Sequence, residues 1–441
     1  MEFGYLLSSA LRDIDSLEEY YSKQHISTVR YVTKGLDKNK YGLAIYKFLC
    51  GRIHGEEKAH CLNDDEEKFI SDELEIIEDA DDKSMVQYKL KDADKFAEYE
   101  LDPHLAEEKT IYLMEQPVIL NNSVIIMLLI KYENAISALY EELLRTFPEA
   151  YLKDKSITYS ELVSLNSDIE DIKAAFIESE IDEFMRKPLK DWYNTFEQKH
   201  KIHFKFGDEF EQFKEIYYRR NVVVHNRGKS NSSYINGVAE SYKCDVGKRL
   251  TPTSSYLKMA FDCTRIIIIE TFLGMTKLLH EKKEFAKKLF VIGYDYMLKS
   301  KWKVSKYIFN SLALERIDGQ SAADIWYSKV NYYVSCKNLD GIDSILSDVE
   351  KMDVSLMKPR LALAKPALLD DFSDVSKILE DTINNGISVK EIKSWPLLLQ
   401  YRESENYKVF TSTHSEIFEI KTCSAEDVQC ISEQNEEPAV P

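Results

Sequence analysis

Residues 213–234 read FKEIYYRRNVVVHNRGKSNSSY, and this stretch decides how the rest of the chain is interpreted. Apolar and aromatic residues recur in it three and four positions apart, which predicts an amphipathic helix. The predicted apolar stripe consists of Phe210, Phe213, Ile216, Tyr217, Arg220, Val223 and Val224. The sequence Asn226-Arg227-Gly228 follows, with a glycine where helices commonly end.

Three polar residues, Arg220, Asn221 and His225, interrupt this apolar pattern. Asn221 and His225 are four positions apart and therefore share a helix face. Burying charged groups costs free energy unless they are paired or used. An Arg and a His near a helix C-terminus can also be simple surface cations that the helix dipole stabilises. Both interpretations stand, and the long apolar segments on either side favour the functional one.

The pattern Arg-Asn-x-x-x-His on a long helix resembles the signature of the HEPN ribonuclease family. That signature is an Arg, four to six further residues and a His, usually with a polar residue directly after the Arg. Here Arg220 gives four intervening residues and Arg219 gives five. The tail His225-Asn226-Arg227-Gly228, followed by Tyr234, also looks like members from bacterial stress and phage-defence systems. The resemblance covers residues 118–283 and implies a helical bundle.

This resemblance implies a metal-independent endoribonuclease without a cofactor. It would be a toxin or effector of antiviral defence, acting by abortive infection, and a homodimer whose two motif helices form one composite site. The products would be a 2′,3′-cyclic phosphate and a 5′-hydroxyl. In one branch of the family a Tyr two positions after the His is modified by a partner enzyme. Arg227 occupies that position here, so control by that route is not implied.

The residue types suit cleavage of RNA, which carries its own nucleophile in the 2′-hydroxyl group. His225 is the candidate acid or base, since histidine ordinarily titrates near physiological pH. Arg220 is the candidate phosphate ligand, because a guanidinium binds phosphate oxygens in a bidentate way. Asn221 would orient the histidine or hold a phosphate oxygen. The candidate substrate-binding residues are Arg219, Asn226, Arg227, Lys229 and Asn231.

Two other classes of function remain open. The bundle could be a catalytically inactive module that holds a nucleotide or RNA through Arg220 and His225. The chain could also be a helical adaptor protein in which the motif is a coincidence. Cleavage of RNA in the presence of a chelator distinguishes the ribonuclease from both of these alternatives.

Composition favours a mainly α-helical chain of two or three domains, because 441 residues include only 14 Gly and 10 Pro. The net charge of −18 argues against a broad nucleic-acid surface, so any RNA contact must be local. The seven scattered cysteines suit reduced thiols in a cytoplasmic protein. The strongest apolar runs, residues 124–130 and 266–269, are too short to span a bilayer, and we expect no membrane contact.

The sequence of residues 1–117 predicts an acidic region and leaves its fold class open between α and α+β. Helical spacing appears in residues 11–21 and 41–53, the acidic stretch 63–82 predicts a solvated helix face, and 84–101 predict a β-hairpin. Cys50, His54, His60 and Cys61 are zinc-ligand types, but their spacing fits no standard site. No metal site is therefore predicted.

Residues 118–283 predict the HEPN-like bundle. Ser123 is expected to cap its first helix and Asp208 to cap the motif helix. The expected helices are 124–145, 159–165, 169–184, 189–200, the motif helix and 255–280.

Residues 284–411 predict helical hairpins that resemble tetratricopeptide repeats. Three similar segments place Trp302, Leu339 and Phe372 in matching positions, 37 and 33 residues apart, which bracket the 34-residue period. Because solenoids offer concave surfaces, we expect a protein partner there, either a sensor or an inhibitor. Residues 412–441 predict a polar acidic tail without fixed structure.

Overall fold

The computed structural model describes residues 3–54, 62–78, 86–153, 156, 158–160, 169–278, 280, 282–314, 317–383 and 386–418. The chain divides into two compact units, Met1–Lys277 and Leu278–Pro441. Helix makes up 78% of the structure. Within the described residues the only strands are two short ones that pair with each other. The predicted all-α fold class is therefore confirmed.

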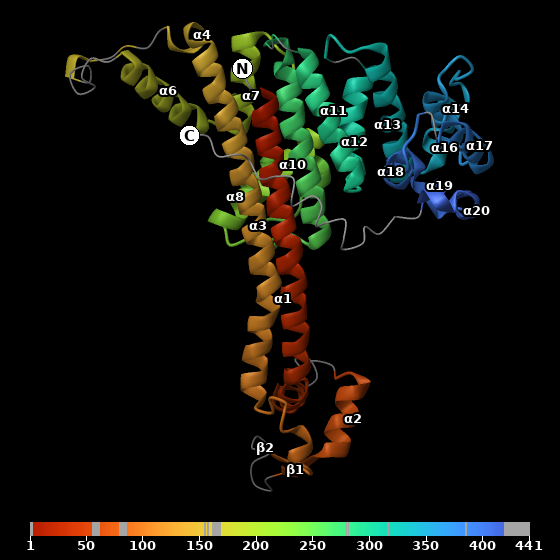
Figure 1. The fold of residues 1–441 in the computed structure, drawn as a ribbon. Coiled ribbons are helices and arrows are strands. Elements are labelled where there is room, and N and C mark those ends of the chain that lie inside the picture. Colours follow the sequence, from red (N-terminus) through yellow and green to blue (C-terminus); the bar gives the residue numbers. More distant parts are fainter. Residues whose placement is uncertain are drawn as a thin grey trace, which may run out of the picture. The chain divides into compact units, whose positions relative to one another are not determined.

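Two long helices, α1 (Phe3–His54) and α3 (Pro103–Thr146), pack against each other and form the frame of unit 1 (Figure 1). At 1.5 Å per residue they are about 78 and 66 Å long. Gly35 and Gly42 allow their close approach. A Cβ atom on Gly35 would lie 2.6 Å from Leu113 Cδ1, and one on Gly42 would lie 2.6 Å from the Glu100 carbonyl oxygen.

Four further helices surround the upper part of this pair. They are α6 (Ile169–Met185), α7 (Leu189–His200), α8 (Asp208–His225) and α10 (Ser254–Gly274). Their core is aromatic: the rings of Tyr132 and Phe213 lie 4.5 Å apart, and the hydroxyl groups of Tyr132 and Tyr193 lie 2.8 Å apart. The short elements of this bundle are α4 (Pro148–Leu152), α9 (Ser232–Gly237), η3 (Glu240–Tyr242) and η4 (Met275–Leu278).

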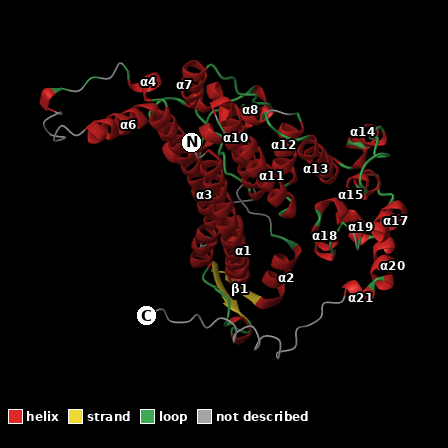
Figure 2. Ribbon diagram, turned by 45° about the horizontal axis from the view of Figure 1, so that its top comes forward, coloured by secondary structure: helices red, strands yellow, loops and turns green. Residues whose placement is uncertain are grey.

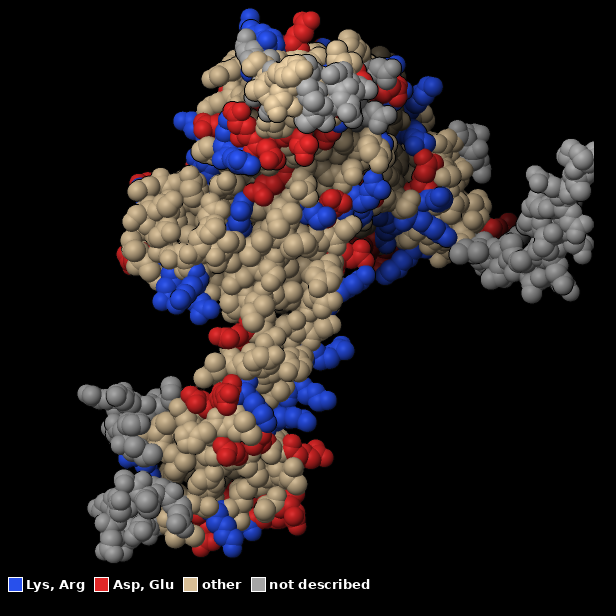
Figure 3. Space-filling model, turned by 90° about the vertical axis from the view of Figure 1, so that its left-hand side faces the viewer, with Lys and Arg blue, Asp and Glu red and all other residues tan. Residues whose placement is uncertain are grey.

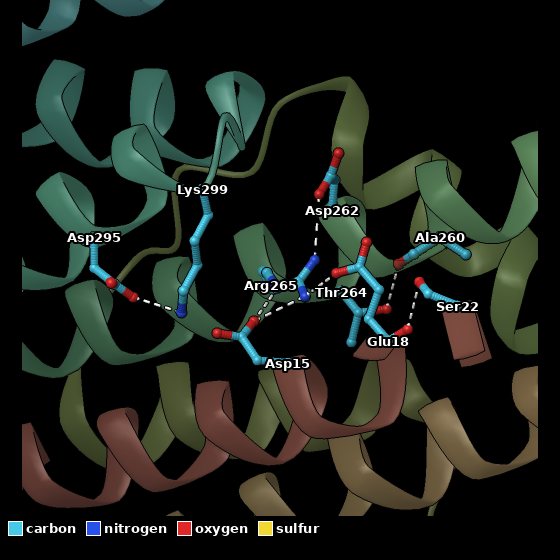
Figure 4. Close-up of polar contacts among 9 residues, drawn as sticks. All are labelled: Asp15, Glu18, Ser22, Ala260, Asp262, Thr264, Arg265, Asp295 and Lys299. Carbon is cyan, nitrogen blue, oxygen red and sulfur yellow. Dashed lines mark hydrogen bonds and ion pairs between the residues drawn. The ribbon is translucent and has the colours of Figure 1, made fainter. Parts of the chain in front are cut away.

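A buried ionic cluster joins α1 to α10. Arg265 is fully buried, and its guanidinium contacts Asp15 at 2.8 Å, Asp262 at 3.3 Å and also Glu18 (Figure 4). Three carboxylates around one guanidinium compensate for removing its charge from water. This cluster fixes the upper end of α1 against the bundle.

The lower ends of α1 and α3 carry a small cap. It contains α2 (Asp64–Glu73), β1 (Leu74–Glu78), β2 (Val86–Leu90) and η2 (Asp94–Phe96), and Figure 2 shows the two strands beside α2. The strands are antiparallel, with Leu74 opposite Leu90. The predicted hairpin within 84–101 is wrong, because β2 pairs with residues upstream of it. The acidic stretch is helical only as far as Glu73, and strand β1 begins at the next residue.

Helix α3 also corrects the predicted start of the bundle. It runs without a break through the expected boundary between residues 117 and 118, and Pro117 lies inside it. Ser123 is not an N-cap: its hydroxyl donates to the Ile119 carbonyl oxygen, one turn earlier. Packing along α1 outweighs the hydrogen bond that a proline removes. Residues 1–117 and 118–277 therefore belong to one compact unit, and the upper boundary lies at 277.

The face of the α1–α3 pair turned to the viewer in Figure 3 is largely uncharged below the bundle. Several α3 side chains, including Ile111, Tyr112, Met114 and Ile119, are more than half exposed. An 18-residue stretch of α3 has a mean hydropathy of 1.6, and a third of it is buried. Length and composition alone would allow this stretch to cross a bilayer, and core helices of soluble proteins pass the same test. The run 124–130, expected to be too short, is part of this longer helix.

Unit 2 is a series of helices in which α11 (Lys282–Leu298), α12 (Trp302–Ala313) and α13 (Ala322–Asp340) pack side by side. Trp302 and Phe372 each begin a helix, as their alignment predicts. Leu339 lies instead in the last turn of α13 and is 45% exposed, so the middle segment does not match the other two. The remaining elements are η5 (Ile342–Ser344), α14 (Leu346–Glu350), α15 (Pro359–Ala362), α16 (Ala364–Leu368), α17 (Phe372–Thr382), α18 (Val389–Ser394), η6 (Pro396–Leu398), α19 (Leu399–Glu403), α20 (Glu405–Thr413) and α21 (Ser415–Phe418).

Some predictions fall on residues outside the described ranges. Residues 161–165 of the expected helix 159–165, residues His60 and Cys61, and residues 419–441 of the expected tail lie there. The described start of that tail is helical, since α20 runs to Thr413 and α21 covers Ser415–Phe418, so the prediction is wrong for residues 412–418. The helices predicted at 169–184 and 189–200 are confirmed.

Candidate functional site

Helix α8 carries the motif, and the burial of its side chains changes along the helix. Phe213, Glu215, Ile216 and Val222 are buried, whereas Val224 is 46% exposed and His225 is exposed. The predicted stripe is therefore wrong at its C-terminal end. Helix α10 starts at Ser254, and its Tyr256 contacts Glu215 and Arg219 of α8. The last turn of α8 therefore extends beyond the N-terminal end of α10. The helix start also differs, since Gly207 and not Asp208 is at the N-cap.

Arg219 belongs to a buried hydrogen-bonded group. Its Nε donates to Glu215 Oε1 at 2.8 Å, and its guanidinium lies 4.2 Å from the centre of the Tyr256 ring. Glu215 is fully buried and also accepts from the hydroxyl groups of Tyr234 at 2.7 Å and Tyr256 at 2.6 Å. All these contacts are internal, so Arg219 serves the fold rather than a substrate.

The residues of this group keep the same protonation states near neutral pH. Burial, followed by the charge of Glu215, raises the pKa of Tyr256 well above its ordinary value. Burial and the hydrogen bond to Glu215 likewise raise the pKa of Tyr234. Burial alone would lower the pKa of Arg219, but Tyr256 and Glu215 outweigh it and raise the pKa. The tyrosines therefore remain donors and Arg219 remains a cation.

Arg220, the next residue, points to a different environment. Its Nη2 pairs with Glu133 of α3, and its guanidinium lies 5.3 Å from the centre of the Tyr217 ring. The two charged side chains are 19% and 26% exposed, so solvent reaches the pair. The Arg220 Nε is buried and has no hydrogen-bond partner among the described residues. The side chain as a whole is still partly exposed, and a guanidinium that solvent reaches can bind an anion.

His225 and Asn221 lie on the side of α8 that the bundle leaves open. His225 is exposed on the last turn, and Asn221 is half-buried one turn earlier. In a regular helix the Cα atoms of Arg220 and His225 are about 7.5 Å apart along the axis. The two residues are also about 140° apart around the helix, so only Asn221 shares a face with His225. Contact of both with one phosphodiester group requires the long arginine side chain to reach round the helix.

The end of α8 is tightly built. The Val222 carbonyl oxygen accepts from the backbone N–H of Asn226 at 2.9 Å and of Gly228 at 3.1 Å. Arg227 and Gly228 both have positive φ angles, 51° and 72°. Such a turn closes the helix where the sequence predicts it.

Two of the predicted substrate ligands have structural roles here. The side-chain amide of Asn226 donates to the Lys229 carbonyl oxygen, and Asn231 caps α9 by accepting from the Tyr234 N–H at 2.9 Å. Arg227 and Lys229 are exposed to solvent. Of the five predicted ligands, only these two present charge at the surface near His225.

The sequence did not reveal the partners of the two arginines. Glu215 lies four residues before Arg219, a spacing that could have indicated the pair. Glu133 is 87 residues from Arg220, and nothing in the sequence connects them. Tyr256 belongs to a helix whose position against α8 only the fold determines.

Other parts of unit 1 offer less chemistry. No group of three or more His, Cys, Asp or Glu residues that could hold a metal ion occurs among the described residues. A hollow of about 670 Å³ lies between α1 and α3, lined by Tyr31, Lys34, Lys38 and Tyr112 among others, and it does not include the motif. Helix α8 therefore remains the candidate site because of its side chains, not because of a deep cavity.

No protein-family model, curated protein or solved structure matches this chain.

Proposed function

We propose that unit 1 is a metal-independent endoribonuclease of the HEPN type, with Arg220 and His225 as catalytic residues and Asn221 as their positioning neighbour. The observation that carries this proposal is the contrast between adjacent arginines. Arg219 is held by the fully buried Glu215 and by Tyr256, whereas Arg220 pairs with the partly exposed Glu133 and lies on the same helix as the exposed His225. Of the two spacings that fit the motif, the structure favours the one that starts at Arg220.

The proposed reaction needs few groups. The ribose 2′-oxygen attacks the adjacent phosphorus and loses its proton, while the bond from phosphorus to the 5′-oxygen breaks and that oxygen gains a proton. His225 accepts or supplies one of these protons. Arg220 binds the non-bridging oxygens and stabilises their charge in the transition state. The products are a 2′,3′-cyclic phosphate and a 5′-hydroxyl group.

His225 supplies one proton-transfer group per chain, and this reaction benefits from two. We therefore propose a homodimer in which the exposed last turns of two α8 helices face each other and complete one site. Sedimentation should give a dimer at micromolar concentration. An enzyme that cleaves while sedimenting only as a monomer would contradict this arrangement.

The function is tested by incubating the purified chain with RNA in EDTA and identifying the fragment ends. We expect cyclic phosphates and 5′-hydroxyl groups. A matched oligonucleotide with one 2′-deoxyribose at the cleavage position should resist, because it lacks the nucleophile. Cleavage of the deoxy substrate, or 5′-phosphate ends, would contradict the proposal.

A catalytically inactive module that holds RNA or a nucleotide is the second proposal. The exposed cations Arg227 and Lys229 favour it, because they can hold phosphates even if Arg220 stays paired with Glu133. RNA binding with no cleavage in EDTA would support this function over the first.

A role in phage defence, and a protein partner on unit 2, remain proposals. Unit 2 has a hollow of about 390 Å³ lined by Phe290, Tyr294, Tyr327 and Trp395, with the ion pair of Arg360 and Glu391 at 2.6 Å. An aromatic lining with a few polar groups suits a peptide segment. Loss of trigger dependence in cells after Tyr327→Glu, with cleavage in vitro unchanged, would support a sensing role.

A further inference from the structure

The connection that follows α8 folds back on itself and forms a short two-stranded arrangement. Lys229 and Arg249 face each other across an isolated antiparallel bridge. The N–H of Ser230 donates to the Lys248 carbonyl oxygen at 2.9 Å, and the N–H of Leu250 donates to the Gly228 carbonyl oxygen at 2.7 Å. Residues 20 positions apart in the sequence are thereby held at the end of the motif helix.

This arrangement brings four exposed cations together, which we name the cationic platform. Its members are Arg227, Lys229, Lys248 and Arg249. No described residue forms an ion pair with any of them. On the same connection, by contrast, Lys243 pairs with Glu240 at 2.5 Å. Like charges held close together repel each other, and the whole chain carries a net charge of −18. A local positive surface on such an acidic protein requires an explanation.

The backbone at Arg227 adds to this argument. Its φ of 51° is a left-handed conformation that glycine adopts more readily than any other residue. The chain has an arginine there. The negative end of the α8 dipole can account for a cation in this turn, but its effect fades within one turn. It does not account for Lys248 and Arg249, which belong to another segment.

Two exposed apolar side chains accompany the cations. Val224 precedes His225 and is 46% exposed, and Val246 lies two residues before Lys248 and is 68% exposed. Phosphates can meet the cations while base faces meet these apolar groups. Only an unpaired strand offers base faces, since a duplex keeps them stacked inside.

We propose that the cationic platform binds the phosphates of single-stranded RNA next to the cleaved bond, with Lys248 and Arg249 as substrate-binding residues. The substrate class rests on the proposed ribonuclease function. In this proposal Lys248 and Arg249 take the place of Asn226 and Asn231 among the substrate ligands.

The test uses the full chain carrying His225→Ala, so that RNA stays intact, and a fluorescent single-stranded RNA of about 20 nucleotides. Affinity is measured from low to high salt with and without K248A/R249A. The loss of two phosphate contacts should make the plot of log K against log salt less steep, by about 1.4 in slope. The matched control is Lys243→Ala, an exposed cation on the same connection, which should leave the slope unchanged. A merely structural role would not change the salt slope selectively.

Three competitors decide between the alternatives. Single-stranded RNA should compete better than a duplex of the same length and far better than polyglutamate. Equal competition by polyglutamate would overturn the proposal in favour of an acidic protein partner, and preference for the duplex would overturn the single-strand assignment. An unchanged salt slope in K248A/R249A also overturns it, even if the wild type cleaves RNA. Platform-dependent RNA binding without any cleavage would support the platform while contradicting the nuclease proposal.

Discussion

Two neighbouring arginines of α8 have different partners. Arg219 is hydrogen-bonded to the fully buried Glu215 and lies against the ring of Tyr256. Arg220 pairs with Glu133, which is 26% exposed, and His225 on the last turn of the helix faces solvent. The two arginine side chains are themselves almost equally exposed, at 15% and 19%, so the difference lies in their partners. The comparison teaches that the burial of the partner, and not residue type, separates the arginine that holds the fold from the arginine available to a ligand.

The largest expected effect on stability comes from replacing Glu215. Glu215→Ala leaves a guanidinium and two hydroxyl groups buried without their acceptor, which should lower the free energy of unfolding by about 3–5 kcal/mol. Denaturant unfolding followed by circular dichroism measures it. Glu211→Ala on the same helix is the control, because Glu211 is partly exposed and pairs only with Lys214. Similar losses in both variants would contradict the role assigned to Glu215.

The adjacent arginines should separate in stability. Arg219→Ala should cost about 2 kcal/mol, because Glu215 stays buried with only its tyrosine donors. Arg220→Ala should cost less than about 1 kcal/mol, since its ion pair is partly exposed. The same unfolding experiment compares them. The comparison breaks if Arg220→Ala is the more destabilising change.

Tyr256→Phe should have a smaller effect that depends on pH. It removes one hydrogen bond to a charged acceptor, worth about 1.5 kcal/mol. Because the folded-state pKa of Tyr256 is raised above the ordinary value of 10.0, its contribution is fully present below pH 10 and is lost as pH rises above it. Wild type and variant should therefore converge in stability above about pH 10. A difference that stays constant from neutral to strongly alkaline pH would oppose this account.

The smallest expected effect concerns Glu133. Glu133→Gln keeps the side-chain shape and removes a charge that competes with phosphate for Arg220. We expect RNA to bind up to about fivefold more tightly, which corresponds to the 0–1 kcal/mol of an exposed pair. Fluorescence anisotropy in the His225→Ala background measures it. Weaker binding would mean that Glu133 orients Arg220 rather than competing for it.

Much of the fold followed from local patterns. Scarce Gly and Pro predicted a helical chain, and periodicity located α6, α7 and α8 within a few residues. The first boundary failed because Ser123 resembles an N-cap. Its environment, a long helix packed along α1, is a tertiary property that no local pattern carries. The hairpin failed for a related reason, since the partner of β2 lay in an acidic segment that suggested a helix.

The candidate site divides in the same way. The motif residues could be named from their spacing, but the environments of Arg219 and Arg220 could not. Their partners come from α3, α9 and α10, and the position of those helices depends on packing across more than a hundred residues. Lys248 and Arg249 were missed because only the backbone bridge to Lys229 brings them to α8.

The most direct test of the central claim is the cleavage rate of Arg220→Ala beside that of Arg219→Ala. Both are measured in EDTA on one RNA oligonucleotide and normalised to folded protein. We predict that Arg220→Ala loses at least about 100-fold, the scale for removing a group that stabilises transition-state charge, whereas Arg219→Ala stays within about tenfold of wild type. Cleavage by Arg220→Ala at the wild-type rate would contradict the account.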